Sequence, residues 1–356
     1  MVDLDDLSIY AKLDPSGMRV HLREMPTQCV RAWEKALTFP LPADYALADK
    51  VLVLGMGGSA IGGDLVAGLV RGEARGPMIT HRGYGLPPFA DSRTLVVASS
   101  YSGATEETLS GFQEALDRPC PKLAITTGGP LLSLAQEHEL PVFQIDYKAP
   151  PRAALSYSLM PLLATLYRLG FVPDPSRAVD EMVAVLEGLA PALAEGSPTE
   201  RNPAKQLALR LRGRMVVIYG AGFLSSVARR WKTQVNENAK GWAFNESLPE
   251  LNHNAVVGYS YPTNAPQHVA VVMLLSDLLN QPIRLRYEVT EELLRKSGVE
   301  PEVISGQGRR ALSQMMSLVL IGDYTSYYLA LLNGVDPYPV PPVDYLKRRL
   351  AEGSSR

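Results

Sequence analysis

The sequence has little cysteine and no excess of charge of either sign. Only Cys29 and Cys120 occur among 356 residues. Two cysteines without metal-ligand spacing cannot form a disulfide framework, so we expect a reducing, cytoplasmic location. The 35 Lys and Arg residues nearly balance 37 Asp and Glu residues, for a net charge of −2. This balance disfavours a nucleic-acid partner held by general electrostatics.

Long uncharged apolar runs are also lacking. No window reaches about 18 uncharged apolar residues, the length of a membrane span. The longest candidate, around 311–332, contains Asp323 and several hydroxyls, so we predict a buried helix there and no membrane partner. The acidic start M-V-D-L-D-D-L has no basic n-region, so we do not expect it to be a secretory signal. None of the five histidines has zinc-ligand spacing, so we expect no metal site.

The sequence does contain short apolar runs that alternate with helix-length segments. Continuous apolar strands separated by helices are typical of parallel sheets covered on both faces. The pattern stops at a proline-rich break, 149–151, and later restarts, which indicates a duplicated α/β unit. The expected strands are 51–55, 77–80, 94–98, 122–126 and 141–145 in the first half, and 215–220, 255–259, 269–275 and 282–287 in the second.

This pattern divides the chain into four segments. We expect a helical N-terminal segment at 1–48, a first α/β domain at 49–172, a helical connection at 173–213, and a second α/β domain at 214–356. Helices at 309–333 and 343–351 would close the second domain.

The first expected strand runs into a glycine-rich turn, G-M-G-G-S-A at 55–60. This turn fits the relaxed dinucleotide fingerprint G-x-G-x-x-A. The fingerprint also needs an acidic residue at the end of the second strand, but that strand ends T-H-R-G at 80–83. No P-loop sequence occurs either, so we expect no nucleotide cofactor. Such a turn can instead bind an anion through backbone N–H groups and the positive end of the following helix.

A second turn carries three hydroxyls: Ser100, Ser102 and Thr105 lie in S-S-Y-S-G-A-T-E-E at 99–107, directly after an apolar strand. One interpretation is that Ser102 and Thr105 only cap the next helix. The other is that the two turns, at the carboxyl ends of neighbouring strands, hold one phosphate group. The two turns together favour the phosphate interpretation.

Candidates for acid/base chemistry lie in the second half. Glu237 stands in N-E-N-A-K at 236–240, inside a predicted helix, and His253 stands in E-L-N-H-N at 250–254. Glu237 could be a solvated residue paired with a lysine of its own helix, and His253 could be a loop histidine. With a phosphate site nearby, they suggest a carboxylate that moves a proton from carbon and an imidazole that moves one from oxygen.

These motifs resemble a known family. The turns at 55–64 and 100–109 resemble those of sugar isomerase (SIS) phosphosugar-binding domains. With N-E-N-A-K and E-L-N-H-N in their order and spacing, they resemble the bifunctional phosphoglucose/phosphomannose isomerase family over roughly residues 45–350. The resemblance implies two doubly wound parallel-sheet SIS subdomains, as duplicated flavodoxin-like halves with helical extensions.

The resemblance also implies an activity. The expected enzyme is a metal-independent aldose–ketose isomerase of glycolysis and gluconeogenesis that needs no cofactor. It would interconvert glucose 6-phosphate, and mannose 6-phosphate, with fructose 6-phosphate through a cis-enediol(ate). Two alternatives stay open: an SIS isomerase acting on another phosphosugar, such as an amino sugar or a pentulose, and a non-catalytic phosphosugar sensor.

Site residues follow from the resemblance. The sugar-phosphate site would comprise Gly57, Gly58, Ser59, Ser100, Ser102 and Thr105. Arg152 would stabilise the enediolate and Glu237 would move the proton between C1 and C2. His253, from the partner subunit of a homodimer, would assist ring opening together with Lys347. Two of these residues also have non-functional interpretations. Arg152 could pair with Asp146, and Lys347 could be a solvated lysine of a basic helix.

Two positions depart from the family pattern. Ala104 stands where family members often have asparagine, in a position that need not touch ligand. The tail D-P-Y-P-V-P-P at 336–342 offers Tyr338 where members often carry a threonine linked to mannose 6-phosphate. The prediction of mannose 6-phosphate activity therefore has less support than that of glucose 6-phosphate activity.

Overall fold

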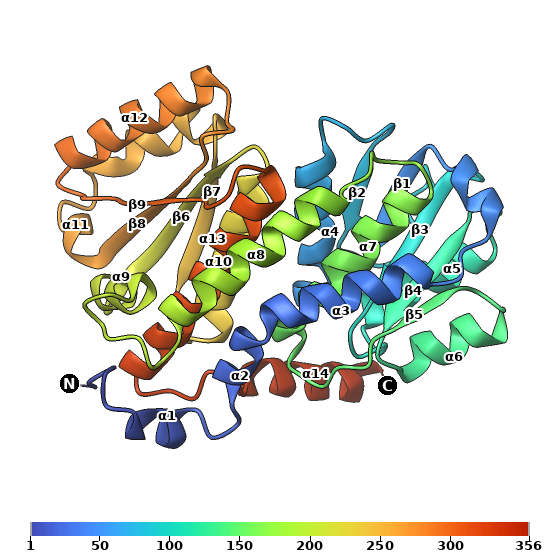
Figure 1. Cartoon of the computed structure of the whole chain (residues 1–356), viewed down its shortest axis with the longest axis horizontal. Helices are drawn as coiled ribbons and strands as arrows, with labels where there is room; N and C mark the ends of the chain where they lie inside the picture. The colour runs from blue at the N-terminus through green and yellow to red at the C-terminus, as the bar shows by residue number, and fades with distance from the viewer. Residues whose placement is uncertain (1, 355–356) are drawn as a thin grey trace.

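The computed structural model describes residues 2–354 and contains two parallel sheets that stand side by side (Figure 1). The first sheet has the order β2-β1-β3-β4-β5, which is the flavodoxin-like order. The second has the order β7-β6-β8-β9, the same arrangement one strand shorter. The predicted α/β fold with two doubly wound halves is therefore confirmed. The strands are β1 (Lys50–Leu54), β2 (Met78–His81), β3 (Thr94–Ser99), β4 (Lys122–Thr126), β5 (Val142–Gln144), β6 (Met215–Ala221), β7 (Ala243–Leu248), β8 (Val269–Leu275) and β9 (Glu302–Ser305).

Helices cover both faces of the first sheet. Alternate residues of β1 point to opposite faces, so Leu52 and Leu54 pack with Phe112 of one layer, while Val51 and Val53 pack into the main core. The helices of this half are α4 (Gly57–Val70), α5 (Glu106–Leu116), α6 (Gly129–Glu137) and α7 (Ser156–Arg168), with α3 (Met25–Thr38) packed on α7.

A long apolar helix forms the centre of the second half. Helix α13 (Ala311–Leu332) is buried over its whole apolar window and packs against α8 (Ser176–Leu193), α9 (Pro203–Leu211) and α10 (Leu224–Glu237). Of residues 2–354, this is the one helix that is long and apolar enough to cross a membrane, and protein covers it on all sides. The prediction of a buried helix at 311–332 is therefore confirmed.

Two predicted strands of the second half are wrong. Residues 282–287 belong to α12 (Gln281–Lys296), where the Asn280 side chain accepts the Ile283 N–H and Pro282 occupies the first turn. Both features favour a helix start. Residues 255–259 lie in the short 3₁₀ helix η4 (Ala255–Ser260). Val257 there is 79% exposed, so its apolar character does not reflect a core strand.

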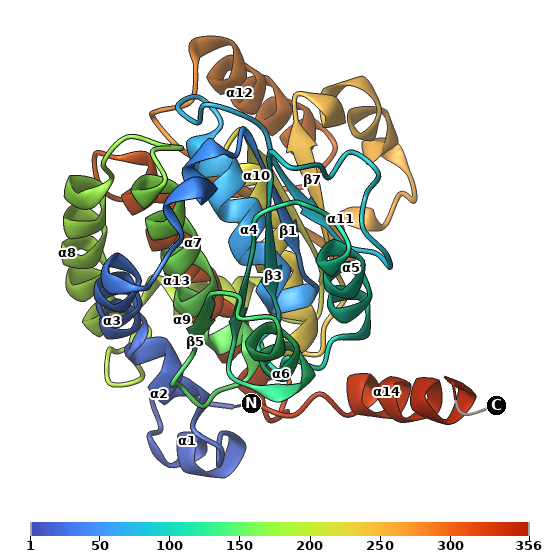
Figure 2. The same cartoon turned by 90° about the vertical axis from the view of Figure 1, so that its right-hand side faces the viewer.

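Short elements and the two ends complete the fold. Helix α14 projects from the body and is exposed (Figure 2). The remaining elements are α1 (Ser8–Leu13), α2 (Met18–Arg23), η1 (Ala43–Leu47), η2 (Pro151–Ala153), η3 (Glu250–His253), α11 (Ala265–His268) and α14 (Pro341–Ser354).

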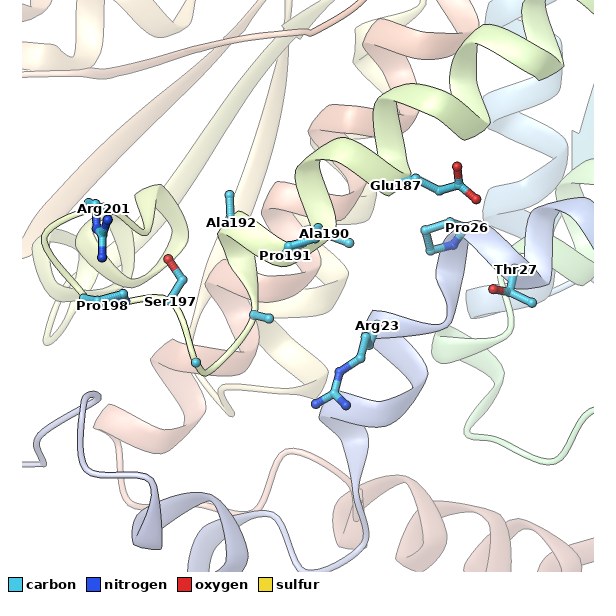
Figure 3. Close-up of a pocket in the computed structure, with 12 residues that line it drawn as sticks. Arg23, Pro26, Thr27, Glu187, Ala190, Pro191, Ala192, Ser197, Pro198 and Arg201 are labelled. Atoms are coloured by element: carbon cyan, nitrogen blue, oxygen red, sulfur yellow. The ribbon is translucent and has the colours of Figure 1, made fainter.

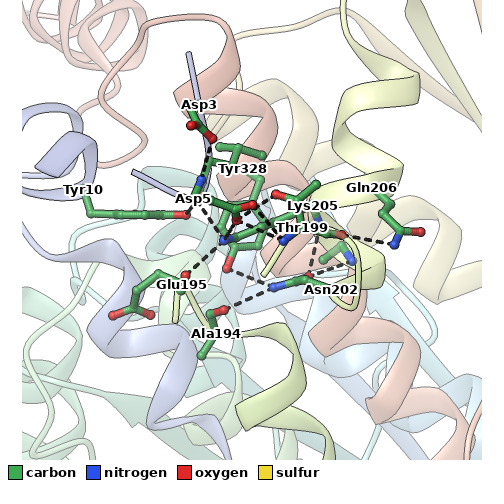
Figure 4. A network of polar contacts seen from close by, with 12 residues as sticks. Asp3, Asp5, Tyr10, Ala194, Glu195, Thr199, Asn202, Lys205, Gln206 and Tyr328 are labelled. Carbon is green, nitrogen blue, oxygen red and sulfur yellow. Dashed lines mark hydrogen bonds and ion pairs between the residues drawn. The ribbon is translucent and has the colours of Figure 1, made fainter. Parts of the chain in front are cut away.

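A buried lysine anchors the N-terminal segment to the second half (Figure 4). Lys205 is fully buried, and its Nζ donates to the carbonyls of Leu4 and Glu195 and to the Asp5 carboxylate, at 2.8–3.0 Å. Three acceptors satisfy the three donors of the ammonium group, which offsets the cost of burying its charge.

Candidate active site

The structure brings the two hydroxyl-bearing turns together. They follow β1 and β3, which are adjacent parallel strands, so both turns lie at the same edge of the sheet. The Tyr101 N–H donates to Ser59 Oγ at 3.0 Å, and Ser99 Oγ donates to the Ser59 carbonyl at 3.3 Å. Ser59 therefore lies against the 99–105 turn, as the sequence predicted.

The 99–105 turn presents hydroxyls at the start of α5. Ser100 is buried, and its Oγ lies 2.9 Å from Thr105 Oγ1. Thr105 occupies the N-cap position of α5, but its side chain makes no capping hydrogen bond. Ser102 Oγ accepts the Ala104 N–H at 3.3 Å. Capping by Thr105 therefore does not explain this turn.

Gly103 sets the shape of this turn. Its φ is +64°, in the left-handed region that favours glycine. A Cβ at this position would lie 1.8 Å from the Gly128 carbonyl oxygen, which no side chain could tolerate. The turn therefore packs directly on the loop that follows β4.

The first turn of α4 connects these hydroxyls to Arg152. Gly57 begins the helix with φ +49°. Gly58 lies so close to η2 that a Cβ on it would approach the backbone nitrogen of Arg152 to 3.1 Å. The lack of a side chain at Gly58 thus lets the backbone of η2 rest on the positive end of α4.

Arg152 is the centre of the site. Its side chain is 3% exposed, Nε donates to Asn238 Oδ1 at 2.7 Å, and Nη2 donates to the carbonyls of Pro337 and Tyr338, both at 2.7 Å. Nη1 lies 3.5 Å from Glu237 Oε2. Burial lowers the pKa of Arg152, and the nearby Glu237 charge opposes that effect.

The alternative pairing of Arg152 with Asp146 does not occur. Asp146 instead accepts a hydrogen bond from Lys35.

Glu237 is presented by a polar face of α10. Arg230, Gln234 and Asn238 lie four residues apart, and all three point toward α13. Arg230 and Gln234 donate to the buried Asp323, and Asn238 Nδ2 donates to Ser326 Oγ at 3.0 Å. This network fixes the end of α10, where the Glu237 side chain is 33% exposed and its carboxylate faces Arg152.

His253 and Lys347 are not brought to Glu237 within one chain. His253 ends η3 and Lys347 lies on α14, and both are exposed. Among residues 2–354, the hydrogen bonds and ion pairs of Glu237 and Arg152 include neither side chain.

Sequence reasoning missed Asn238, Lys240 and the carbonyls of the segment after α13. N-E-N-A-K contains the first two, but only the fold shows that they contact Arg152 and that segment.

A large surface hollow lies elsewhere. It measures about 820 Å³ and lies between the α2–α3 region and the end of α8 (Figure 3). Its lining includes Arg23, Glu187 and Arg201 but none of the predicted site residues. Within residues 2–354, no group of three or more His, Cys, Asp or Glu side chains is arranged to hold a metal ion.

Known proteins resemble this chain over most of its length. The model of the bacterial phospho-glucose isomerase C-terminal SIS domain matches residues 200–350. A bifunctional phosphoglucose/phosphomannose isomerase from Caldicellulosiruptor bescii is 40% identical over 92% of this chain and 97% of its own length. The chain belongs to this family.

A second relative supports this assignment, and a solved structure supports the fold. The Aquifex aeolicus protein of the same name is 33% identical over 84% of this chain and 90% of its own length. A solved structure, described as a hypothetical protein from Thermus thermophilus, superposes with a TM-score of 0.75. It covers 98% of this chain and 93% of its own at 17% identity, which supports the fold alone.

Proposed function

We propose that this protein interconverts glucose 6-phosphate and mannose 6-phosphate with fructose 6-phosphate through a cis-enediolate. The observation that carries the proposal is the Glu237 carboxylate held beside Arg152. The backbone of Arg152 rests on the first turn of α4, and Ser59 of that turn lies against the turn that carries Ser100 and Thr105. Members of the family carry both sugar names, which supports both activities for this chain.

The proposed reaction uses the site as follows. Glu237 takes the proton from C2 of the open-chain aldose, the C–H electron pair forms the C1=C2 bond, and the C1=O π electrons move to O1 to give the enediolate. A proton then moves from the O2 hydroxyl to O1. The same carboxyl returns its proton to C1 as the C2=O bond forms, which gives the ketose with no net change in the enzyme. Arg152 places its positive charge where the enediolate oxygen becomes negative. No step of this scheme uses a metal ion.

The phosphate would lie between the two turns. Gly57, Gly58 and Ser59 would contribute the start of α4, while Ser100, Ser102 and Thr105 would contribute hydroxyls. A group bound this far from the reacting carbons supplies positioning energy. Because hydroxyls and N–H groups donate hydrogen bonds without a counter-ion, they suit a dianionic phosphate.

We further propose a cytoplasmic homodimer in which His253 acts across the interface. His253 is exposed in the single chain, and Val257 and Tyr261, which follow it closely, are each 79% exposed. Such apolar surface is typical of an interaction site. Lys347 would also assist ring opening, and because α14 projects from the body, this role requires α14 to pack against the assembled dimer.

Subunit mixing tests this arrangement. The variants Glu237→Gln and His253→Ala should each be inactive alone, but a hybrid dimer would contain one site with both groups intact. After dissociation and random reassociation, about a quarter of wild-type activity should return. Failure to recover activity, with hybrid dimers shown by mass spectrometry, would place His253 in its own chain's site or outside the mechanism.

Turnover of fructose 6-phosphate to each aldose phosphate tests the function itself. We expect coupled assays to detect both glucose 6-phosphate and mannose 6-phosphate. Binding of phosphosugars without turnover of either would favour a sensor. Turnover confined to an amino-sugar or pentulose phosphate would favour a different SIS isomerase.

A further inference from the structure

The segment between α13 and α14 crosses over Arg152. We call residues 335–340 the C-terminal strap. The strap has few side chains that could bind the site, but it turns three successive carbonyls toward it. Arg152 Nη2 donates to Pro337 and Tyr338 at 2.7 Å, and Lys240 Nζ donates to Pro339 at 2.7 Å and reaches the Pro337 oxygen at 3.4 Å. Two cations thus hold one piece of main chain.

Lys240 is oriented by the end of α10. It lies three residues beyond Glu237 with φ +56°, a left-handed conformation that costs energy for a residue with a side chain. This conformation lets Nζ donate to the Glu237 carbonyl at 2.6 Å while it also reaches the strap. A second bond joins the same region, from Asn333 Nδ2 to the Ala239 carbonyl at 3.0 Å. The left-handed backbone at Lys240 therefore occurs where the end of α10 contacts the strap and the end of α13.

We propose that Lys240 is a positioning residue of the isomerase site, which holds the C-terminal strap against Arg152 and so fixes the guanidinium beside Glu237. The inference rests on the proposed function. Arg152 depends on the strap for both acceptors of Nη2, and its contact with Glu237 is already long at 3.5 Å. If the strap moves, Arg152 loses these acceptors and its position relative to the enediolate oxygen.

The electrostatic surroundings of Lys240 support this role. Although the residue as a whole is exposed, its ammonium group contacts the carbonyls of Glu237, Pro337 and Pro339. Burial of that end, together with the positive charge of Arg152, lowers the pKa of Lys240 to about 8, against the opposing effects of Asp336 and Glu237. A solvated surface lysine would keep its ordinary value. Since the pKa is depressed, the charge is lost as the pH rises through about 8.

The test compares Lys240→Met, Lys240→Arg and the control Lys232→Met. Lys232 lies on the same helix, and within residues 2–354 it forms no ion pair or side-chain hydrogen bond. We expect Lys240→Met to lower kcat about tenfold or more, with KM changed less than about threefold because the phosphate turns are untouched. Lys240→Arg should restore most of kcat, and Lys232→Met should match the wild type. A Lys240→Met kcat within twofold of the wild type would overturn the inference.

The pH profile distinguishes positioning from a merely structural role. The wild-type kcat should fall above about pH 8, whereas Lys240→Arg should remain active there because arginine keeps its proton. This comparison does not require Lys240→Met to fold. An identical alkaline fall in both proteins would mean that Lys240 is not the group responsible, and would count against the inference.

Hydrogen exchange separates this inference from the proposed function. Peptides that cover residues 335–345 should exchange faster in Lys240→Met than in the wild type and Lys232→Met. An inactive wild type would refute the proposed function, but the exchange result would still show whether Lys240 holds the strap. Unchanged exchange in a folded Lys240→Met protein would overturn the inference even if the enzyme is active.

Discussion

Replacing Glu237 by glutamine should abolish isomerisation while the fold survives. The amide has the shape of the carboxylate but cannot accept a proton from carbon. Loss of a positioned general base costs about 100- to 10,000-fold in rate, or roughly 3–5 kcal/mol of transition-state stabilisation. We therefore expect kcat to fall within that range, with KM for fructose 6-phosphate little changed because the phosphate turns are intact.

The structural cost of the same change should be small. The Glu237 side chain is 33% exposed and meets Arg152 at one contact of 3.5 Å. A partly exposed pair of this kind contributes about 1 kcal/mol or less. Arg152 keeps its bonds to Asn238, Pro337 and Tyr338, so its buried charge remains solvated by protein. The Tm should therefore shift by less than about 5 °C.

The assay couples glucose 6-phosphate formation to its dehydrogenase and follows NADPH. Glu237→Asp serves as a matched control, since it keeps the carboxylate but withdraws it by one methylene, and it should retain part of kcat. Full activity in Glu237→Gln would refute Glu237 as the base. A large loss of Tm would show that the carboxylate is chiefly structural.

Three further predictions concern other parts of the chain. Ser102→Ala and Thr105→Ala should each raise KM about tenfold with kcat retained, as expected for a weakened phosphate contact; unchanged KM in both would contradict their role. Gly103→Ala should lower Tm and raise KM together. The left-handed φ of +64° alone costs an alanine about 1–2 kcal/mol, and the new Cβ would meet the Gly128 carbonyl. Wild-type values of both Tm and KM would refute this account. Lys205→Met should lower the free energy of unfolding by about 2–5 kcal/mol in urea titrations, because the buried Leu4 carbonyl and the partly buried Glu195 carbonyl lose their donor. An unchanged urea midpoint would show that those carbonyls find other donors.

The strands that the sequence predicted well are those buried on both faces. All residues of β3 and β4 are buried, and such strands appear as continuous apolar runs. The edge strand β7 was missed because its burial alternates along A-F-N-E-S-L and no long apolar run marks it. The erroneous strand at 282–287 shows the opposite problem. There, P-I-R-L-R-Y has the alternating pattern of a strand, but the Asn280 cap and Pro282 start a helix.

The site was visible in the sequence only where local chemistry is unusual. Ser100 and Thr105 stand out because a buried strand ends in hydroxyls, and Glu237 stands out between two asparagines. The contact of Arg152 with Glu237 spans 85 residues, and its contact with the Pro337 carbonyl spans 185. A main-chain carbonyl has no signature in the sequence, so the strap could not be predicted. The partner-dependent positions of His253 and Lys347 stay predictions.

The duplication explains why one chain has one such site. Helices α4 and α10 follow the first strand of each half, and they run in opposite directions against each other. Gly68, late in α4, packs on Phe223 at the start of α10, while the start of α4 meets the end of α10 at Arg152. The positive end of α4 therefore faces the hydroxyl turns, and the negative end of α10 lies beside the two cations that hold the strap. At the opposite end of this helix pair, the turn before α10 carries Phe223, and α10 begins at Leu224 with Ser225 and Ser226 in its first turn. In the proposed function, the first half supplies the phosphate turns and the second supplies the carboxylate.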